Sequence, residues 1–386
     1  MIKNKLMSGA VSLFVVIFSA LLITVITVGF AGIMIRDQRQ ATDNDLSQSA
    51  YSTAQAGVED GKRAIIRYIN CKGVASLDCD KIRGVMENAA LTPQTCTNTI
   101  DGLDGVTVEN GEVDVKSGTS DDKFNQAYTC VKIKLNTSEY LGVLPGNNSK
   151  LVPLTSKNDA YFNKVQVDWF IKTDLQSGNT ADVPGILSKL LMKEWGAKPS
   201  IMRVQLIQYG SNGFKLTDFD NDPNSNSRTL FLYPSTVSAV DIDFSKDIRG
   251  NPNALGEADI EFAHCTTDFS GNGGYACTAT LLLPDPIGGG NRTAFLNVTP
   301  LFAKANFRVS LYNSLIGELV EYSGQPEIDS TGRTNDVFRR VKSRVEMTNT
   351  NYTYPEAAVD IEGDINSLCK AFDVGIDYYN EGPCTL

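Results

Sequence analysis

AVSLFVVIFSALLITVITVGFAGIMI, residues 10–35, contains no charged side chain. As an α-helix this run is about 39 Å long at about 1.5 Å per residue, and the hydrocarbon core of a bilayer is about 30 Å thick. The apolar core of a secretory signal peptide is shorter, at about 7–15 residues. The run therefore predicts a helix that crosses a membrane or packs in a bundle of similar helices.

The helical pattern continues beyond Ile35, because the first proline of the chain is Pro93. We predict one helix over residues 10–69 whose first half is apolar all round and whose second half has one apolar face. Its glycines cost about 1 kcal/mol each relative to alanine and predict bends or locally melted turns. These are Gly29, Gly32, Gly57 and Gly61, and the apolar face consists of Leu46, Ala50, Ala54, Val58, Ile65 and Ile69.

The first 65 residues resemble those of a known superfamily. A basic leader with Lys3 and Lys5, then Gly9 and the apolar run, looks like the class III signal peptide of type IV pilins and type II secretion pseudopilins. Residues 47–65, SQSAYSTAQAGVEDGKRAI, resemble the N-terminal region of PilX-like minor pilins. That family usually has Ala-Glu-Ala-Gly where this chain has residues 54–57, Ala-Gln-Ala-Gly.

The resemblance implies a processing site, a set of partners and an α+β fold. A prepilin peptidase would cut after Gly9 and leave Ala10 as the mature N-terminus. The helix would sit in the membrane before assembly, then pack with other pilin subunits in a filament, and its second half would pack against an antiparallel sheet. The assembly residues would be Phe14, Val16, Leu21, Ile26, Gly29 and Gly32, and the seam between helix and head Leu46, Ala50, Ala54, Ala56, Gly57, Val58 and Ile65.

The chain departs from the family pattern at two positions. Ser8 precedes Gly9, where a basic or other polar residue is common. Phe14 stands five residues into the expected mature chain, where most major pilins carry a glutamate that neutralises the N-terminal amine of a neighbouring subunit. PilX-like minor pilins and tip-type pseudopilins often lack this glutamate. The resemblance therefore implies a minor or tip subunit.

The distribution of charge predicts how the chain is oriented in a membrane, and the net charge disfavours one class of partner. The formal net charge is −10 and the sequence pI about 4.8, which argues against nucleic-acid binding. Lys3 and Lys5 precede the apolar run without a neighbouring acid, whereas Arg36 and Arg39 after it are outnumbered by acids. The positive-inside rule then predicts a cytoplasmic N-terminus and an external remainder, at the cell surface or in a filament.

Eight cysteines fit an oxidising compartment. None lies in a Cys-x-x-Cys pair and no histidine cluster accompanies them, so zinc spacing is absent. Eight cysteines allow 105 connectivities, and free buried thiols in a reducing compartment are the alternative. We predict sequential disulfides: Cys71 with Cys79, Cys96 with Cys130, Cys265 with Cys277, and Cys369 with Cys384.

Residues 70–386 are rich in strand signals. Asn110-Gly111 between alternating residues predicts a hairpin, and short helices are expected at 81–90 and 183–195. Residues 337–347 predict the strand that closes the sheet beside the long helix. We divide the chain into residues 1–9, 10–69, 70–200 and a second β-rich lobe at 201–386. Further strands are expected near 131–135, 165–169, 202–208, 229–233, 237–244, 279–283 and 307–312.

Chemistry-bearing motifs are sparse. The one histidine, His264, adjoins Cys265 and could form a nucleophile pair, but a structural role is the commoner one. Asp218, Asp220 and Asp222 alternate and could offer oxygens to Ca²⁺, although the EF-hand pattern fails. We therefore expect no enzyme, no cofactor and no resident metal. A surface hydrolase is disfavoured, and a membrane-anchored adhesin or binding ectodomain remains the alternative to a filament subunit.

Overall fold

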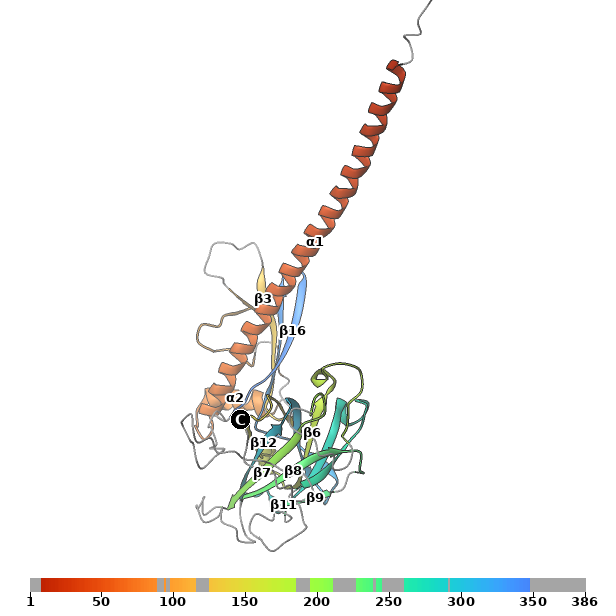
Figure 1. Cartoon of the computed structure of the whole chain (residues 1–386). Coiled ribbons are helices and arrows are strands. Elements are labelled where there is room, and N and C mark those ends of the chain that lie inside the picture. The colour runs from red at the N-terminus through yellow and green to blue at the C-terminus, as the bar shows by residue number, and fades with distance from the viewer. Residues whose placement is uncertain are drawn as a thin grey trace, which may run out of the picture. The chain divides into compact units, whose positions relative to one another are not determined.

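The computed structural model describes residues 8–88, 94, 98–115, 125–184, 195–210, 227–238, 241–244, 260–290 and 292–347. The chain forms two compact units, and Figure 1 labels their elements. The first contains the N-terminal helix with a small sheet, from Met1–Ile133 and Ile328–Ser343. The second comprises Lys134–Glu327 and Arg344–Leu386 and contains a large sheet. The chain is α+β, as its sequence predicts.

A single helix, α1 (Ser8–Asn70), makes up the first 63 described residues. It runs unbroken through all four glycines, so the predicted locally melted turns are absent from it (Figure 1). Gly57 and Gly61 are buried in it rather than exposed. Their lack of a side chain serves close packing, which stabilises the helix enough to offset their low helix propensity.

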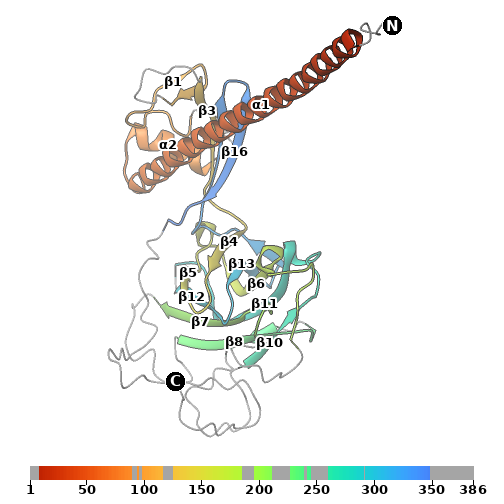
Figure 2. The ribbon, with the colours of Figure 1, turned by 45° about the horizontal axis from the view of Figure 1, so that its top comes forward.

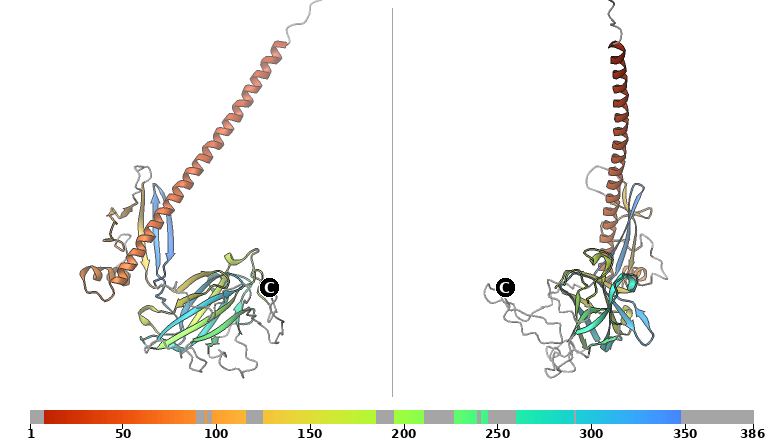
Figure 3. Two further views of the ribbon diagram at one scale, coloured as in Figure 1. Left: turned by 60° about the vertical axis from the view of Figure 1, so that its left-hand side comes forward. Right: turned by 45° about the vertical axis from the view of Figure 1, so that its right-hand side comes forward.

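The first unit pairs α1 with a five-stranded sheet, whose longer strands are drawn beside the helix in the left view of Figure 3. The predicted Asn110-Gly111 hairpin is present, with φ of 52° and 85° at its two turn residues. The sheet order is β1 (Val108–Glu109), β2 (Glu112–Asp114), β3 (Gln126–Lys134), β15 (Glu327–Thr334), β16 (Val337–Arg344).

A short helix, α2 (Leu77–Glu87), follows α1 and starts four residues earlier than predicted. The reason is local: the Ser76 hydroxyl accepts a hydrogen bond from the Cys79 N–H at 3.2 Å and caps the first turn. The other predicted helix, 183–195, lies mostly outside the described residues.

The second unit has a sheet of eleven strands (Figure 2). Most neighbours are antiparallel, but β10 pairs with β8 and β9 with β11 in parallel. Short 3-10 helices, η1 (Lys157–Asp159), η2 (Lys172–Asp174) and η6 (Asn272–Gly274), connect strands. The strands are β4 (Glu139–Leu144), β5 (Lys150–Pro153), β6 (Phe162–Ile171), β7 (Ile201–Gly210), β8 (Ser227–Ser235), β9 (Asp241–Asp243), β10 (Ile260–Cys265), β11 (Tyr275–Ile287), β12 (Arg292–Leu301), β13 (Ala305–Asn313) and β14 (Glu318–Val320).

The large sheet curls around its own core. Its strand order begins at β14 and ends at β5, and Tyr322, just beyond β14, bridges both Thr137 and Ser156. The Tyr322 hydroxyl donates to the Pro153 carbonyl of β5 at 2.8 Å. The alternating residues Val165, Val167 and Trp169 of β6 are fully buried in that core, as their period of two predicts.

The division of the chain differs from the expected boundary near residue 200. The backbone leaves the small sheet after β3, builds the second unit, and returns to pair β15 with β3. Residues 134–327 of the second unit are therefore inserted between two neighbouring strands. The expected boundary placed β15 and β16 in the second lobe, because they come about 200 residues after β3. They belong instead to the sheet that contains β3. As predicted, residues 337–344 complete the sheet beside the helix.

The strand predicted at 237–244 is also shorter than expected. Among the described residues of this stretch, which leave out 239–240, Asp241–Asp243 alone form a strand, and Val237 lies in a bend. The Val237 N–H donates to the Ser235 hydroxyl at 3.2 Å, a local bond that competes with strand pairing.

Candidate assembly helix and its seam with the small sheet

The first part of α1 is exposed apolar surface. Every side chain from Leu13 to Asp45 is exposed. Phe14 is 76% exposed and Val16 63%, and Leu21 and Ile26 are 60% and 48% exposed. Burying such a side chain is worth about 1.5–3 kcal/mol, so a row of them requires lipid or other apolar helices around it. This helix is long and apolar enough to cross a membrane.

Residues 36–45 form a polar collar between the apolar run and the packed part of the helix. All ten side chains are exposed, and they include Arg36 and Arg39 against Asp37, Asp43 and Asp45. About 15 Å of helix at about 1.5 Å per residue therefore separates the apolar segment from the small sheet. Mixed charges of this kind belong in water or at a membrane surface.

The seam between α1 and the small sheet is closest at Gly332 of β15. A Cβ added at Gly332 would collide with the Ala50 carbonyl oxygen and the Ala54 amide of the helix. Ala50 and Ala54 are themselves fully buried. Helix and strand backbones are thus in direct contact, and that contact requires small residues on both sides.

Two helix glycines extend this close contact along the seam. A Cβ on Gly57 would overlap the Ser330 hydroxyl and lie 3.0 Å from the Tyr128 ring. A Cβ on Gly61 would lie 2.7 Å from the Ile328 side chain. The sheet residues that pack here come from β3 and β15, which are neighbours in the small sheet.

The predicted seam residues have different degrees of burial. Ala50, Ala54, Gly57, Val58 and Ile65 are buried, whereas Leu46 and Ala56 are only half-buried. Sequence reasoning missed four buried positions of the same face. Spacings of three as well as four would have indicated them, because a helical stripe uses both. The missed residues are Thr53, Gly61, Ala64 and Tyr68.

Polar contacts fix the register of helix and sheet. Ser49 bonds Thr334 at 2.9 Å and accepts from Gln126 at 2.8 Å, so one serine of α1 contacts both β15 and β3. The buried Tyr128 hydroxyl donates to the Asp60 carboxylate, which also pairs with Arg63 at 2.8 Å. Burial, followed by the bond to Asp60, raises the pKa of Tyr128 well above its usual range.

The C-terminal end of α1 is closed by a disulfide and by arginines. Cys71 and Cys79 form the predicted bond and link the helix end to α2. Arg67 donates to the Asp101 carbonyl at 3.2 Å, and Arg63 donates to that of Asp104. The Tyr68 hydroxyl donates to Glu87 of α2 at 2.7 Å. A shallow depression of about 460 Å³ lies among these residues.

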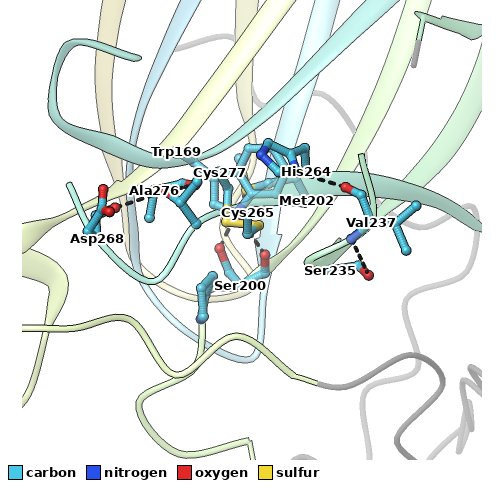
Figure 4. Close-up of a disulfide and its surroundings, with 12 residues drawn as sticks. Trp169, Ser200, Met202, Ser235, Val237, His264, Cys265, Asp268, Ala276 and Cys277 are labelled. Carbon is cyan, nitrogen blue, oxygen red and sulfur yellow. Dashed lines mark hydrogen bonds between the residues drawn. A yellow bond between two sulfur atoms is a disulfide. The ribbon is translucent and has the colours of Figure 1, made fainter. Parts of the chain in front are cut away.

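The predicted Cys265–Cys277 disulfide is also present and joins directly paired residues of β10 and β11 (Figure 4). Of the other predicted pairs, Cys130 is in a disulfide, and Cys96, Cys369 and Cys384 lie outside the described residues. The His264 Nδ1 atom lies 2.7 Å from the Val237 carbonyl oxygen. Because the sulfur of Cys265 is held in a disulfide, Cys265 and His264 form no nucleophile pair.

Other charged groups of the second unit serve the fold. Asp168, which alternates with the apolar residues of β6, is fully buried beneath Arg308. Arg308 contacts the Asp168 carboxylate at 2.8 Å and covers the Tyr275 ring at 4.8 Å, and Gln166 donates to the same carboxylate at 2.8 Å. This partner is distant in sequence, so no local pattern could reveal it.

No metal cluster is present within the described part of the chain. The calcium candidates Asp218, Asp220 and Asp222 lie outside the described residues. Gly9 and Ala10, the expected processing site, lie in the first turn of α1.

Comparison of the chain with family models, with curated proteins and with solved structures found no match.

Proposed function

We propose that this chain is a minor type IV pilin or pseudopilin-like structural subunit. The supporting observation is the continuous helix α1, whose first part is exposed apolar surface and whose second part is built into a folded head. One element thereby carries both an anchor and the spine of a domain. The residue pattern of the first 65 residues adds the expected leader and processing site.

In this proposal the role is structural rather than catalytic. The apolar segment holds the subunit in the membrane with its N-terminus in the cytoplasm, and then packs with the helices of other subunits. Prepilin peptidase removes residues 1–9 first. Disulfides on the exported side fit this topology, because they persist in oxidising compartments.

N-terminal sequencing of the protein from membranes and from sheared filaments tests the processing step. We expect a chain that begins at Ala10. A chain that still begins at Met1, or one cut beyond Ile35, contradicts the proposal. Immunogold electron microscopy of intact cells should place label on filaments or their tips.

The second candidate is a single-pass surface adhesin or binding ectodomain that enters no filament. The separate core of the inserted second unit favours it, because such a unit can carry a binding function of its own. In that case the leader stays uncut and gold label lies on the bare envelope. The same two experiments therefore separate the candidates.

A charge within the apolar run tests the role of the helix. A carboxylate deep in a bilayer costs about 2.5–3.5 kcal/mol, so Val16→Asp should lower the membrane-bound and filament-bound fractions several-fold. Val16→Leu is the matched control and should change neither. Both variants should keep the head folded, as judged by resistance to proteolysis. An unfolded head in Val16→Asp would contradict the separation of anchor and head.

A further inference from the structure

Two disulfides of the described structure differ in how open they are. Cys71 and Cys79 are 6% and 9% exposed, and both line the depression at the end of α1. Cys265 and Cys277 are 1% and 0% exposed and belong to the large core (Figure 4). We propose that Cys71–Cys79 is a thiol–disulfide exchange site for small anionic thiols, and that its opening releases α2 from the end of α1.

Access to a sulfur atom decides where exchange starts, because the attacking thiolate must reach that sulfur. The depression has a volume of about 460 Å³, and Ile66, which is 58% exposed, forms part of its lining. A small thiol entering it meets the cysteines directly. Cys265 and Cys277 instead pair across neighbouring strands among core residues, so a thiol reaches them only when the large sheet opens.

The charge of the depression favours an anionic thiol. Arg63, Arg67 and Cys71 follow one another at intervals of four residues, and the Cys71 N–H donates to the Arg67 carbonyl at 3.0 Å, so the three side chains share a helix face. Both arginines line the depression, and no acidic residue does so within the described part of the chain. Arg63 pairs with Asp60 at 2.8 Å, whereas Arg67 donates to the neutral Asp101 carbonyl at 3.2 Å. A cation at this place attracts an anionic thiol and stabilises the thiolate that leaves.

The exchange conserves atoms and electrons. The sulfur of an external thiolate forms a bond to one cysteine sulfur, the Cys71–Cys79 bond breaks, and its electron pair leaves on the other sulfur as a thiolate. A second external thiol then attacks the mixed disulfide, frees the second cysteine and leaves as the disulfide of the reagent. Two thiols thus supply the two electrons and two protons that the reduced cysteines hold.

The attachment of α2 depends on this bond. Of the residues of α2, Cys79 and Met86 alone are buried. Its Arg83 side chain donates to the Cys71 carbonyl, a polar contact at the same end of α1. Opening the disulfide removes the covalent link and leaves α2 with one other buried side chain and a few hydrogen bonds. We therefore expect α2 to open locally when the bond is exchanged.

Thiol treatment of the full-length protein in a non-ionic detergent tests the access. The reagent is the anionic thiol mercaptoethanesulfonate, and alkylation traps each cysteine that becomes free. We expect peptide mass spectrometry to find Cys71 and Cys79 labelled at least tenfold faster than Cys265 and Cys277. Equal or slower labelling of Cys71 and Cys79 would mean that the depression gives no access, and the proposal would be wrong.

A neutral thiol of similar size, mercaptoethanol, tests the role of charge. At low ionic strength, Arg67→Gln should lower the ratio of the anionic to the neutral rate at least threefold at Cys71 and Cys79. The ratio cancels any general change in access. Lys62→Gln removes a positive charge from the same helix outside the depression and should leave the ratio unchanged. An unchanged ratio in Arg67→Gln, or an equal fall in Lys62→Gln, would overturn the preference for anionic thiols.

Amide hydrogen exchange tests the release of α2. The double variant Cys71→Ser/Cys79→Ser and the thiol-treated protein should both exchange the amides of α2 at least tenfold faster than the untreated protein. The amides of β3 should keep their rates, which shows that the small sheet is intact. If β3 is unprotected in the double variant, the thiol-treated protein decides. Unchanged protection of α2 with the bond open would overturn the proposed release.

Discussion

Single side chains decide how α1 is attached to its sheet. Ser49 contacts two strands, and Tyr128 reaches from β3 to Asp60 of the helix. The sequence predicts a strand at 131–135, which leaves out Tyr128, and it does not predict that the Tyr128 hydroxyl meets a carboxylate 68 residues away. Such pairs depend on the three-dimensional placement of two elements, which periodicity alone does not supply.

Replacing Tyr128 with phenylalanine should remove a hydrogen bond to a charged group, worth about 1.5–3 kcal/mol of unfolding free energy. The change should also alter how the free energy of unfolding depends on pH at alkaline pH. The pKa of Tyr128 is raised above 10.0 in the folded protein, so its contribution is fully present below pH 10 and is lost as the pH rises further. Urea unfolding at neutral and alkaline pH should show a shallower alkaline loss in Tyr128→Phe. Tyr51→Phe, at an exposed position of the same helix, is the control, and an equal effect there would contradict this account.

At the scale of elements, the sequence predicts the long helix well because its signal is local. An uncharged run followed by a one-sided stripe needs no distant partner to be recognised. The role of its glycines could not be predicted in this way. Gly57 and Gly61 predict weak points, yet they are buried against Tyr128 and Ile328, whose position depends on the fold of the sheet.

Gly332→Val should separate the helix from the sheet. Its Cβ meets helix backbone, which cannot move aside as a flexible side chain can, so the expected loss is about 2–3 kcal/mol. Gly84→Ala in α2 is the matched control. A Cβ there meets no other atom within 4 Å, and alanine should stabilise the helix by about 0.5–1 kcal/mol. Far-ultraviolet circular dichroism during urea unfolding measures both. A neutral Gly332→Val would mean that the backbones are not in contact.

For the whole molecule, the main feature that the sequence did not predict is the insertion of residues 134–327 between the neighbouring strands β3 and β15. Strand signals identified several strands of both units, including the closing strand 337–344, but not which of them are neighbours. The pairing of β3 with β15 across the second unit depends on contacts far apart in sequence. It divides the protein into two cores that are interleaved in the chain.

Two intrinsic probes report these cores separately. Both tryptophans of the chain, Trp169 and Trp195, are buried in the second unit, whereas 63 helical residues belong to α1 of the first. Gly332→Val should therefore shift the circular dichroism transition to lower urea and leave the tryptophan fluorescence transition in place. Phe162 is a fully buried residue of the large core. Phe162→Ala should lower the free energy of unfolding measured by tryptophan fluorescence by about 3–5 kcal/mol, and it should leave the circular dichroism transition unchanged. The measurements use the full-length protein in detergent, because its apolar run is exposed. If each variant moved both transitions together, the units would unfold as one cooperative block, and the two cores would not be energetically independent.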